Sequence, residues 1–372
     1  MSGFAYLDHN ATSPLRPAAL EAMVEALRLG GNPSSVHRAG RKARSMVELA
    51  RRQVATLVGA APGEVVFTSG GTEANNMAMS GSGRGRILIS AVEHESVRSA
   101  APGAPVLPVD ACGVVDLAAL ERRLWESDVP ALVSVMLANN ETGVIQPLAE
   151  VVRLAHKAGA LVHCDVVQAA GKIPLDLHGM GADYLSLSAH KLGGPTGVGA
   201  LVMREGVPFV SSRHGGGQES NRRAGTENLS GIVGFGVAAE EAGRNIADVK
   251  MRDGLEASLL AVAPQARVLS AGAPRLPNTT CIAMPGVSAE TQVMALDLAG
   301  VCVSAGAACS SGKVRRSPVL AAMGVDDGVA DAAIRISLGW NSRPEDIERL
   351  IGAWRDLYIR AGQSDMPEAR AA

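Results

Sequence analysis

Two charged residues stand at the ends of neighbouring apolar runs in the middle of the chain. Asp165 ends the run 160–165, and Lys191 follows the run 183–187. In an open α/β sheet, ligands bind beside the carboxyl ends of the strands, so we expect both side chains in one crevice. Burial favours the neutral amine of a lysine, which can bond covalently to an aldehyde. An aspartate can keep a pyridine nitrogen protonated as an electron sink. The alternatives are a structural ion pair or two unrelated surface residues.

A glycine pair opens a predicted helix in the segment 67–76, FTSGGTEANN. Gly70 and Gly71 let the backbone approach a ligand closely, and Thr72 brings a hydroxyl beside the unpaired amides of the first turn. Such a helix start can hold a phosphate group. The alternative, favoured while the segment is taken alone, is an ordinary helix cap made by Thr72 and Glu73.

Cys309 lies among small residues in the segment 304–312, SAGAACSSG, which has the composition of a flexible loop. An exposed cysteine near Lys313, Arg315 and Arg316 should have a stabilised thiolate, the reactive form. The alternative is a small buried cysteine, against which the polar neighbours argue. We expect the other four cysteines to be structural, and Cys302 to be buried within GVCVS; they are Cys112, Cys164, Cys281 and Cys302.

Short apolar runs alternate with amphipathic segments over most of the chain. Strands are expected at 64–67, 86–90, 105–109, 131–136, 160–165, 183–187 and 199–203. Helices are expected between them, for example at 39–58, 72–81, 116–126 and 147–158. The alternation predicts an α/β fold with a mostly parallel sheet of seven strands. Consecutive apolar positions suit strands that are buried on both faces.

The last part of the chain has a different pattern. It turns helical over 228–260 and then gives a smaller α+β unit with a strand at 278–284, a helix at 288–298, a strand at 333–337 and a helix at 344–359. We therefore predict a large domain at 15–258, a small domain made of 1–14 and 259–360, and a flexible tail at 361–372.

Composition excludes several classes of protein. The 372 residues are 47% hydrophobic, which is ample for a core, and 35 basic residues nearly cancel 37 acidic ones. That balance lacks the global basic field of a nucleic-acid-binding protein. Five cysteines without a CxxC pair argue against a zinc ribbon or a disulfide framework. The N-terminus has no signal-peptide pattern and no run could span a bilayer, so we expect a cytoplasmic protein without membrane contacts.

The segments taken together resemble the cysteine desulfurase family, within the class V aminotransferase-like, fold-type I enzymes that use pyridoxal 5′-phosphate. The resemblance runs from Tyr6 to about Arg355. It rests on YLDHNATSP, GNPSSVHRAGRKAR, FTSGGTEANN, EHESV, NNETGVIQP, HCDVVQAAGKIPLDL, LSLSAHKLGGPTGVGAL, HGGGQESNRRAGTEN, SAGAACSSG and IRISLG. Two departures, Trp340 after the SLG motif and HNATSP in place of NAATTP, leave the predicted chemistry untouched.

The resemblance implies three catalytic residues: Lys191 binds the cofactor covalently, His94 stacks on its ring, and Cys309 carries a persulfide. It also implies that Asp165 pairs with the pyridine nitrogen, and that Asn140 and Gln168 hydrogen-bond the phenolic oxygen, with Asn140 also contacting the substrate. The implied phosphate cup consists of Gly71, Thr72, Ser188 and His190, and Thr226 of a second subunit is a further implied phosphate ligand. Arg335 is implied to bind the substrate carboxylate.

The implied activity is conversion of L-cysteine to L-alanine, with transfer of the sulfur from Cys309 to an acceptor. The implied assembly is a homodimer, and the expected acceptor is a protein such as an iron–sulfur scaffold or an enzyme of thio-cofactor synthesis. A selenocysteine lyase, another class V enzyme and a non-catalytic scaffold that binds sulfur carriers are the alternatives. Cys309 argues against an aminotransferase, which needs no nucleophilic cysteine.

Overall fold

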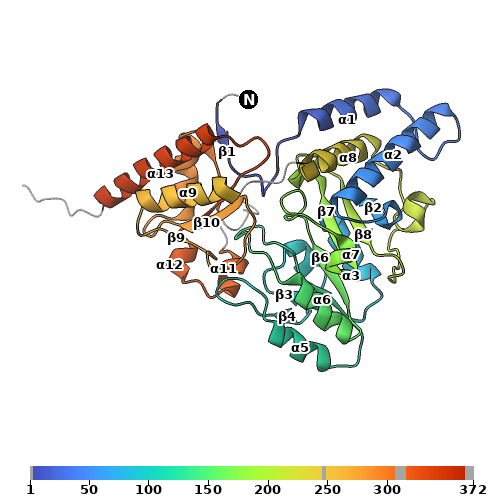
Figure 1. Ribbon diagram of the computed structural model, residues 1–372, viewed down its shortest axis with the longest axis horizontal. Helices are drawn as coiled ribbons and strands as arrows, with labels where there is room; N and C mark the ends of the chain where they lie inside the picture. Colours follow the sequence, from blue (N-terminus) through green and yellow to red (C-terminus); the bar gives the residue numbers. More distant parts are fainter. Residues whose placement is uncertain (1–2, 245–248, 306–315, 365–372) are drawn as a thin grey trace, which may run out of the picture.

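A seven-stranded sheet forms the centre of the computed structural model, which describes residues 3–244, 249–305 and 316–364 (Figure 1). The strand order is β2-β8-β7-β6-β5-β3-β4. The strands are β2 (Val65–Thr68), β3 (Arg86–Ser90), β4 (Val106–Leu107), β5 (Ala131–Ser134), β6 (Leu161–Asp165), β7 (Tyr184–Ser188) and β8 (Gly199–Met203). β8 is antiparallel to β2 and β7, and the other pairs are parallel.

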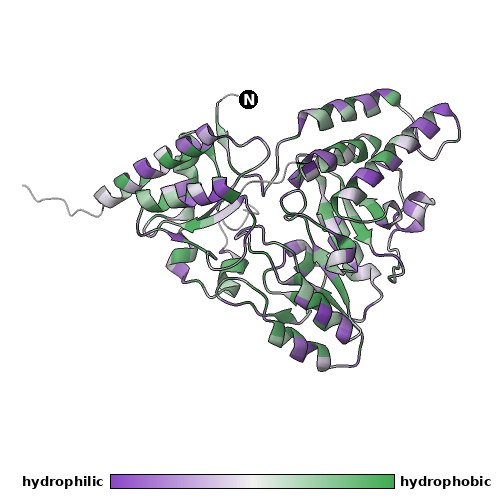
Figure 2. Cartoon of the chain, viewed as in Figure 1, coloured by the Kyte–Doolittle hydropathy of each residue, from purple (hydrophilic) through white to green (hydrophobic). Residues whose placement is uncertain are grey.

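The α/β class and the mostly parallel sheet of seven strands are thereby confirmed. The strands expected at 105–109 and 131–136 are shorter than predicted. β4 is an edge strand that pairs only with β3, over Ile89–Val106 and Ser90–Leu107, so fewer of its residues meet a partner. β7 and β8 are buried along their whole length, and Figure 2 shows the strands of this sheet largely in the hydrophobic colour.

Helices pack on the sheet and on one another. They are α1 (Pro17–Leu29), α2 (Arg38–Leu57), α3 (Gly71–Gly81), α4 (Glu95–Arg98), α5 (Leu117–Trp125), α6 (Leu148–Lys157), α7 (Leu177–Met180) and α8 (Leu229–Arg244). α2 and α1 both pack against α8 (Figure 1). α2 turns Ala43, Val47, Ala50 and Val54 inward, at the spacing that places side chains on one face of a helix.

A second, smaller unit has its own antiparallel sheet, in the order β12-β13-β10-β9. Its elements are α9 (Val249–Val262), β9 (Arg267–Val268), β10 (Thr279–Ala283), α10 (Ala289–Leu298), β11 (Val301–Cys302), β12 (Ser304–Ala305), α11 (Pro318–Ala322), α12 (Asp327–Ala330), β13 (Ala333–Ser337) and α13 (Pro344–Ser364). The start of the chain joins this unit, because β1 (Ala5–Tyr6) pairs with β11. A separate core around Trp354 includes Ala5 and Leu7 from the chain start, but also Leu255 of α9, which the predicted boundary at 258 would place in the large domain. The division into 15–258 and 1–14 with 259–360 stays a prediction.

α13 is longer than the predicted helix 344–359. It continues to Ser364, because Tyr358 and Ala361 still pack against the core of the small unit. The first residues of the predicted tail 361–372 are therefore helical, and residues 365–372 lie outside the described part of the chain.

The described cysteines differ in burial. Cys164 and Cys281 are buried as expected, but Cys112 and Cys302 are only half-buried. The prediction of a buried Cys302 is wrong. β11 pairs only with β1, and successive side chains of a strand point to opposite faces, so Val301 faces the core while Cys302 points to the less covered face.

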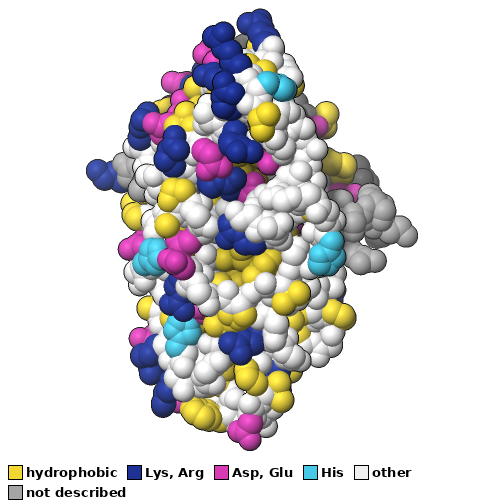
Figure 3. Space-filling model, turned by 90° about the vertical axis from the view of Figure 1, so that its right-hand side faces the viewer, with side chains coloured by type: hydrophobic (Ala, Val, Ile, Leu, Met, Phe, Trp, Pro, Cys, Tyr) yellow, Lys and Arg dark blue, Asp and Glu magenta, His cyan; other side chains and the backbone are white. Residues whose placement is uncertain are grey.

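Positive charge is concentrated locally, although the chain as a whole is nearly neutral. Figure 3 shows Lys and Arg side chains gathered toward the upper end of the face that α1 and α2 occupy in Figure 1. The exposed basic residues of α2 are Arg38, Arg41, Lys42, Arg44 and Arg52. In the described ranges, no helix is both long and apolar enough to cross a membrane.

Candidate active site

A cavity of about 380 Å³ lies at the carboxyl ends of β6 and β7. Its lining includes every candidate residue that the structure describes except Thr226: Gly71, Thr72, His94, Asn140, Asp165, Gln168, Ser188, His190, Lys191 and Arg335. Thr226 is exposed and lies outside the cavity of its own subunit. Cys309, Lys313 and Arg315 lie outside the described residues.

Lys191 ends a single 3-10 turn, Ala189–Lys191, directly after β7. Its amine donates to the backbone carbonyls of Asn10 and Ala11, each at 2.7 Å. Burial, and then the positive charge of Arg335, lower the pKa of Lys191 to about 8. A substantial fraction of this amine is therefore neutral near physiological pH, which is the form that attacks a carbonyl group.

Asp165 is held at the end of β6 by two donors. Its Oδ2 accepts from Asn75 Nδ2 at 2.8 Å, and its Oδ1 accepts from the backbone N–H of Val167 at 2.9 Å. The side chain is buried, and the amine of Lys191 bonds carbonyl groups rather than this carboxylate. The contacts therefore do not support a structural ion pair between Asp165 and Lys191.

The start of α3 is left open toward the cavity. The cap residue is Gly70, and no side chain caps the helix. Glu73 turns away to accept from the N–H of Ser69 at 2.6 Å and to pair with Arg223 at 2.9 Å. The alternative of a cap made by Thr72 and Glu73 is therefore wrong. Because the first-turn amides have no capping side chain, they are available to an anion.

Gly71 is tightly enclosed at the same place. A Cβ atom there would lie 3.0 Å from Val167 Cγ2 and 3.5 Å from the Cβ of Ser188. The backbone of the helix start therefore approaches Val167, in the segment after β6, more closely than a side chain would comfortably allow, and lies in contact with Ser188 at the end of β7. This close approach brings Thr72 and Ser188 to one end of the cavity.

Two histidines border the cavity in different settings. His94 is exposed and accepts at Nδ1 from the N–H of Ser96 at 3.1 Å, which caps α4. His190 has its Nδ1 3.0 Å from the hydroxyl of Thr12. Burial, followed by the charge of Lys191, lowers the pKa of His190 to about 4, so that its imidazole is neutral at physiological pH.

Arg335 reaches the cavity from β13 of the small unit. One terminal nitrogen donates to the carbonyl of Asn140 at 3.1 Å, and the other donates to Asp8 Oδ1 at 2.7 Å. Its Nε is buried and has no hydrogen-bond partner. The Arg335 side chain lines the cavity, and a guanidinium group at such a position is suited to an anionic group of a ligand, such as a carboxylate.

Three residues of this site were not expected from the sequence. Asn75 holds Asp165, Asp8 holds Arg335, and Asn10 supplies the carbonyl that accepts from Lys191. The available signal was their position inside the motifs FTSGGTEANN and YLDHNATSP.

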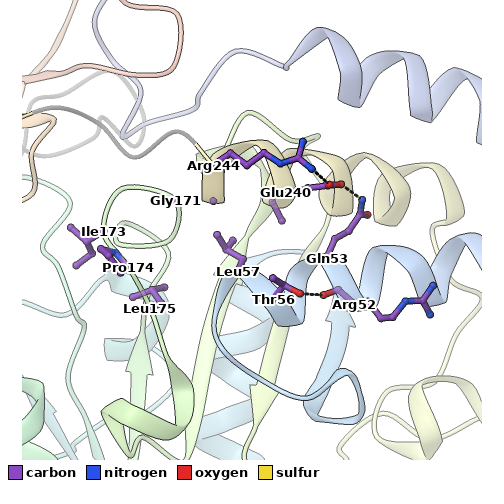
Figure 4. A pocket seen from close by; sticks show the side chains of 12 residues that line it. Arg52, Gln53, Thr56, Leu57, Gly171, Ile173, Pro174, Leu175, Glu240 and Arg244 are labelled. Carbon is purple, nitrogen blue, oxygen red and sulfur yellow. Dashed lines mark hydrogen bonds and ion pairs between the residues drawn. The ribbon is translucent and has the colours of Figure 1, made fainter.

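Another cavity, of about 480 Å³, lies between α2, α8 and the segment 171–175 (Figure 4). Its polar rim is already paired within itself: Gln53 Nε2 donates to Glu240 at 2.5 Å, and Arg244 pairs with the same carboxylate. None of the described candidate residues lines it. The cavity at the ends of β6 and β7 is therefore the candidate active site.

The chain belongs to the aminotransferase class-V family, whose model matches residues 5–350. It is similar to a cysteine desulfurase from Cereibacter sphaeroides, with 48% identity over 363 residues and 93% of both chains covered. A cysteine desulfurase from Sinorhizobium fredii is 44% identical over 366 residues, covering 93% of this chain and 94% of the relative. The solved structure of a NifS-like protein from Rickettsia africae aligns with a TM-score of 0.89 at 37% identity, covering 96% and 99% of the two chains.

Membership in this family implies pyridoxal 5′-phosphate as the cofactor, and the cavity fits it. An amine with a lowered pKa, a buried carboxylate and an uncapped helix start match its aldehyde, its pyridine nitrogen and its phosphate. The volume of about 380 Å³ also lies within the usual range for small-molecule sites.

Proposed function

We propose that the protein is a cysteine desulfurase that converts L-cysteine to L-alanine and passes the sulfur on as a persulfide of Cys309. The observation that carries the proposal is one cavity that is lined by both the Lys191 amine and the guanidinium side chain of Arg335. The first group suits a carbonyl cofactor, and the second suits the carboxylate of an amino acid. The similarity to cysteine desulfurases over 93% of the chain selects the reaction.

The cofactor would be held by groups that differ in chemistry. Asp165 would pair with the pyridine nitrogen, Gln168 and Asn140 would donate to the ring oxygen, and His94 would contact the ring. The start of α3 would hold the phosphate together with the remaining donors, which are Gly71, Thr72, Ser188 and His190. When bound, pyridoxal 5′-phosphate supplies an electron sink for negative charge at the substrate Cα.

The protein's own residues then perform three tasks. Arg335 binds the substrate carboxylate and fixes the orientation of the amino acid. The amine of Lys191, with a pKa of about 8, takes the proton from Cα and later returns a proton to the product. His94 is near enough to the cavity to exchange protons with the substrate.

Cys309 supplies the nucleophile. Its thiolate attacks the sulfur of L-cysteine, so that an S–S bond forms while the substrate Cβ–S bond breaks. The electron pair of the broken bond stays with the substrate, which takes up a proton and leaves as alanine. The persulfide on Cys309 then passes its outer sulfur to an acceptor thiol.

A homodimer is part of the proposal. Thr226 is exposed outside its own cavity, and a preceding segment, Glu219–Asn221, has three successive residues with positive φ of 48°, 56° and 64°. Glu219 is buried and accepts from both terminal nitrogens of Arg51, at 2.7 and 2.9 Å. A strained segment held by a buried ion pair is typical of a functional position, and it supports presentation of Thr226 to the phosphate of a second subunit.

The sulfur acceptor is proposed as a protein such as an iron–sulfur scaffold or an enzyme of thio-cofactor synthesis, in the cytoplasm. Such a partner must bring a thiol to the Cys309 persulfide, because the outer sulfur is transferred only to a thiol that reaches it.

The test is incubation of the purified protein with pyridoxal 5′-phosphate, L-cysteine and a thiol reductant. We expect alanine and sulfide in equal amounts, and a visible absorbance band from the bound cofactor. L-Serine is the matched control, because it has the same carboxylate and amine but no sulfur. Binding of the cofactor without alanine release from L-cysteine would refute the proposed activity.

A further inference from the structure

Lys172 is a buried lysine directly behind the candidate active site. Its side chain is nine-tenths buried, and it lies on the turn that follows β6, next to a cavity that Lys191 also lines. Its amine donates to Gln168 Oε1 and to Asn10 Oδ1, each at 2.8 Å. Both partners are neutral amide oxygens, so Lys172 connects two side-chain amides rather than neutralising a carboxylate.

These two bonds contribute to the orientation of each amide. The oxygen and nitrogen of a side-chain amide are nearly equal in shape, so their placement is decided by hydrogen bonding. The Lys172 amine donates to both oxygens, which turns both NH₂ groups away from it. Gln168 Nε2 then donates to the carbonyl of Asn10 at 3.0 Å, and Asn10 Nδ2 donates to the carbonyl of Asn140 at 3.2 Å.

The same network reaches Lys191. The backbone carbonyl of Asn10 accepts from Gln168 Nε2 and also from the Lys191 amine, at 2.7 Å. Asn10 is 1% exposed and is fixed further by Thr279 and Asn278, which hydrogen-bond its side chain at 2.9 and 3.2 Å. A change at Lys172 is therefore transmitted to a cavity-lining amide and to the segment that holds the Lys191 amine.

The surroundings of Lys172 disfavour its charged form. Burial, and then the nearby charges of Lys191 and Arg335, hold the pKa of Lys172 well below its usual value. A neutral amine still has two N–H groups, which is the number that the two amide oxygens require. Lys172 thus has an N–H group for each amide oxygen whether or not it is protonated.

We propose that Lys172 is a positioning residue of the cofactor site, which fixes Gln168 so that an N–H group faces the ring oxygen of pyridoxal 5′-phosphate. This inference rests on the proposed function, because it needs that cofactor in the cavity. Without Lys172, the Gln168 amide can turn and present its oxygen to the negatively charged ring oxygen, which is repulsive. Loss of the Lys172 amine also leaves the side-chain oxygens of Gln168 and Asn10 each with one hydrogen bond fewer.

The test compares Lys172→Met, which keeps the length of the side chain but has no donor, with Gln168→Glu, which replaces the proposed donor by an acceptor. Lys157→Met is the matched control, because Lys157 is exposed and pairs only with Glu121 among its described contacts. The readouts are the dissociation constant for pyridoxal 5′-phosphate, the pH midpoint of the bound cofactor's absorbance change, and the melting temperature of the protein without cofactor.

We expect both site variants to bind the cofactor about tenfold more weakly, the equivalent of one lost buried hydrogen bond. We also expect the pH midpoint of the absorbance change to rise. Without a donor the negatively charged ring oxygen is less stabilised, so the bound cofactor loses its proton only at higher pH. Lys157→Met should match the wild type. A shift in Gln168→Glu with wild-type behaviour in Lys172→Met would overturn the inference.

A third variant distinguishes a loss of protein stability from the loss of the hydrogen-bond donor. Lys172→Gln keeps an N–H donor, so it should restore the absorbance midpoint at least partly, even where melting shows that Lys172→Met is unstable. The same midpoint in Lys172→Gln and Lys172→Met would mean that donation is not the role of this residue. A wild-type protein that binds no pyridoxal 5′-phosphate would instead refute the proposed function itself.

Discussion

Replacement of Arg335 by lysine tests how the site recognises an amino acid. The substitution keeps a positive charge but removes the planar group whose Nε is buried without a partner. Lysine is a point charge on a flexible chain and cannot bind a carboxylate in the same two-point geometry. We therefore expect Arg335→Lys to bind L-cysteine more weakly, while its chemical step changes little.

The magnitude follows from the hydrogen bonds involved. The guanidinium already donates one N–H to Asn140 and one to Asp8, so a substrate carboxylate would use the two remaining N–H groups of the terminal nitrogens. Lysine replaces one of these two bonds, and a hydrogen bond to a charged group is worth ~1.5–3 kcal/mol. The KM for L-cysteine should therefore rise about 10- to 150-fold, with kcat within about threefold of the wild type.

Initial rates of alanine formation over a range of L-cysteine concentrations give both constants. Arg275→Lys is the matched control, because Arg275 is equally buried in the small unit and binds both oxygens of Glu256, at 2.7 and 2.9 Å. That variant should lower the melting temperature and leave the KM unchanged. An unchanged KM in Arg335→Lys, or an equal rise in Arg275→Lys, would refute the assignment of Arg335 to the substrate.

Four further predictions concern the remaining groups. The protein without cofactor should capture pyridoxal 5′-phosphate faster as pH rises and level off above about 8, since the neutral Lys191 amine is the nucleophile; a rate independent of pH would contradict this. Asp165→Asn should keep the bound cofactor but slow exchange of the substrate Cα proton at least about tenfold, because the electron sink is weakened; unchanged exchange would make Asp165 merely structural. Mixed dimers of Lys191→Ala and Thr226→Ala should regain activity in one of their two sites, and mixtures as inactive as the parents would argue against shared sites. Cys309→Ser should bind L-cysteine yet release almost no alanine, whereas Cys302→Ser stays active; mass spectrometry that finds the extra sulfur on Cys302 would remove Cys309 from its role.

The orientation of β8 follows from a feature of the sequence, the length of the segment that precedes this strand. The connection Ala189–Val198 between β7 and β8 is shorter than the dozen or more residues of a parallel crossover, so its length favours an antiparallel pair. α1 was also readable, because Pro17 opens it and Gly30 closes it with a φ of 62°. Both features are local, and local features can be predicted from spacing.

The order of apolar runs and turns determined the sheet, because strands that are buried on both faces need continuous apolar sequence. It also placed Asp165 and Lys191 at strand ends, and therefore near one another at one edge of the sheet. Only the tertiary structure decided which distant groups meet there. Asn10 accepts from Lys172 and Lys191, and Arg335 pairs with Asp8, across more than 150 residues of chain in each case. Such contacts leave no periodic signal, because they depend on how the small unit packs against the ends of the large sheet.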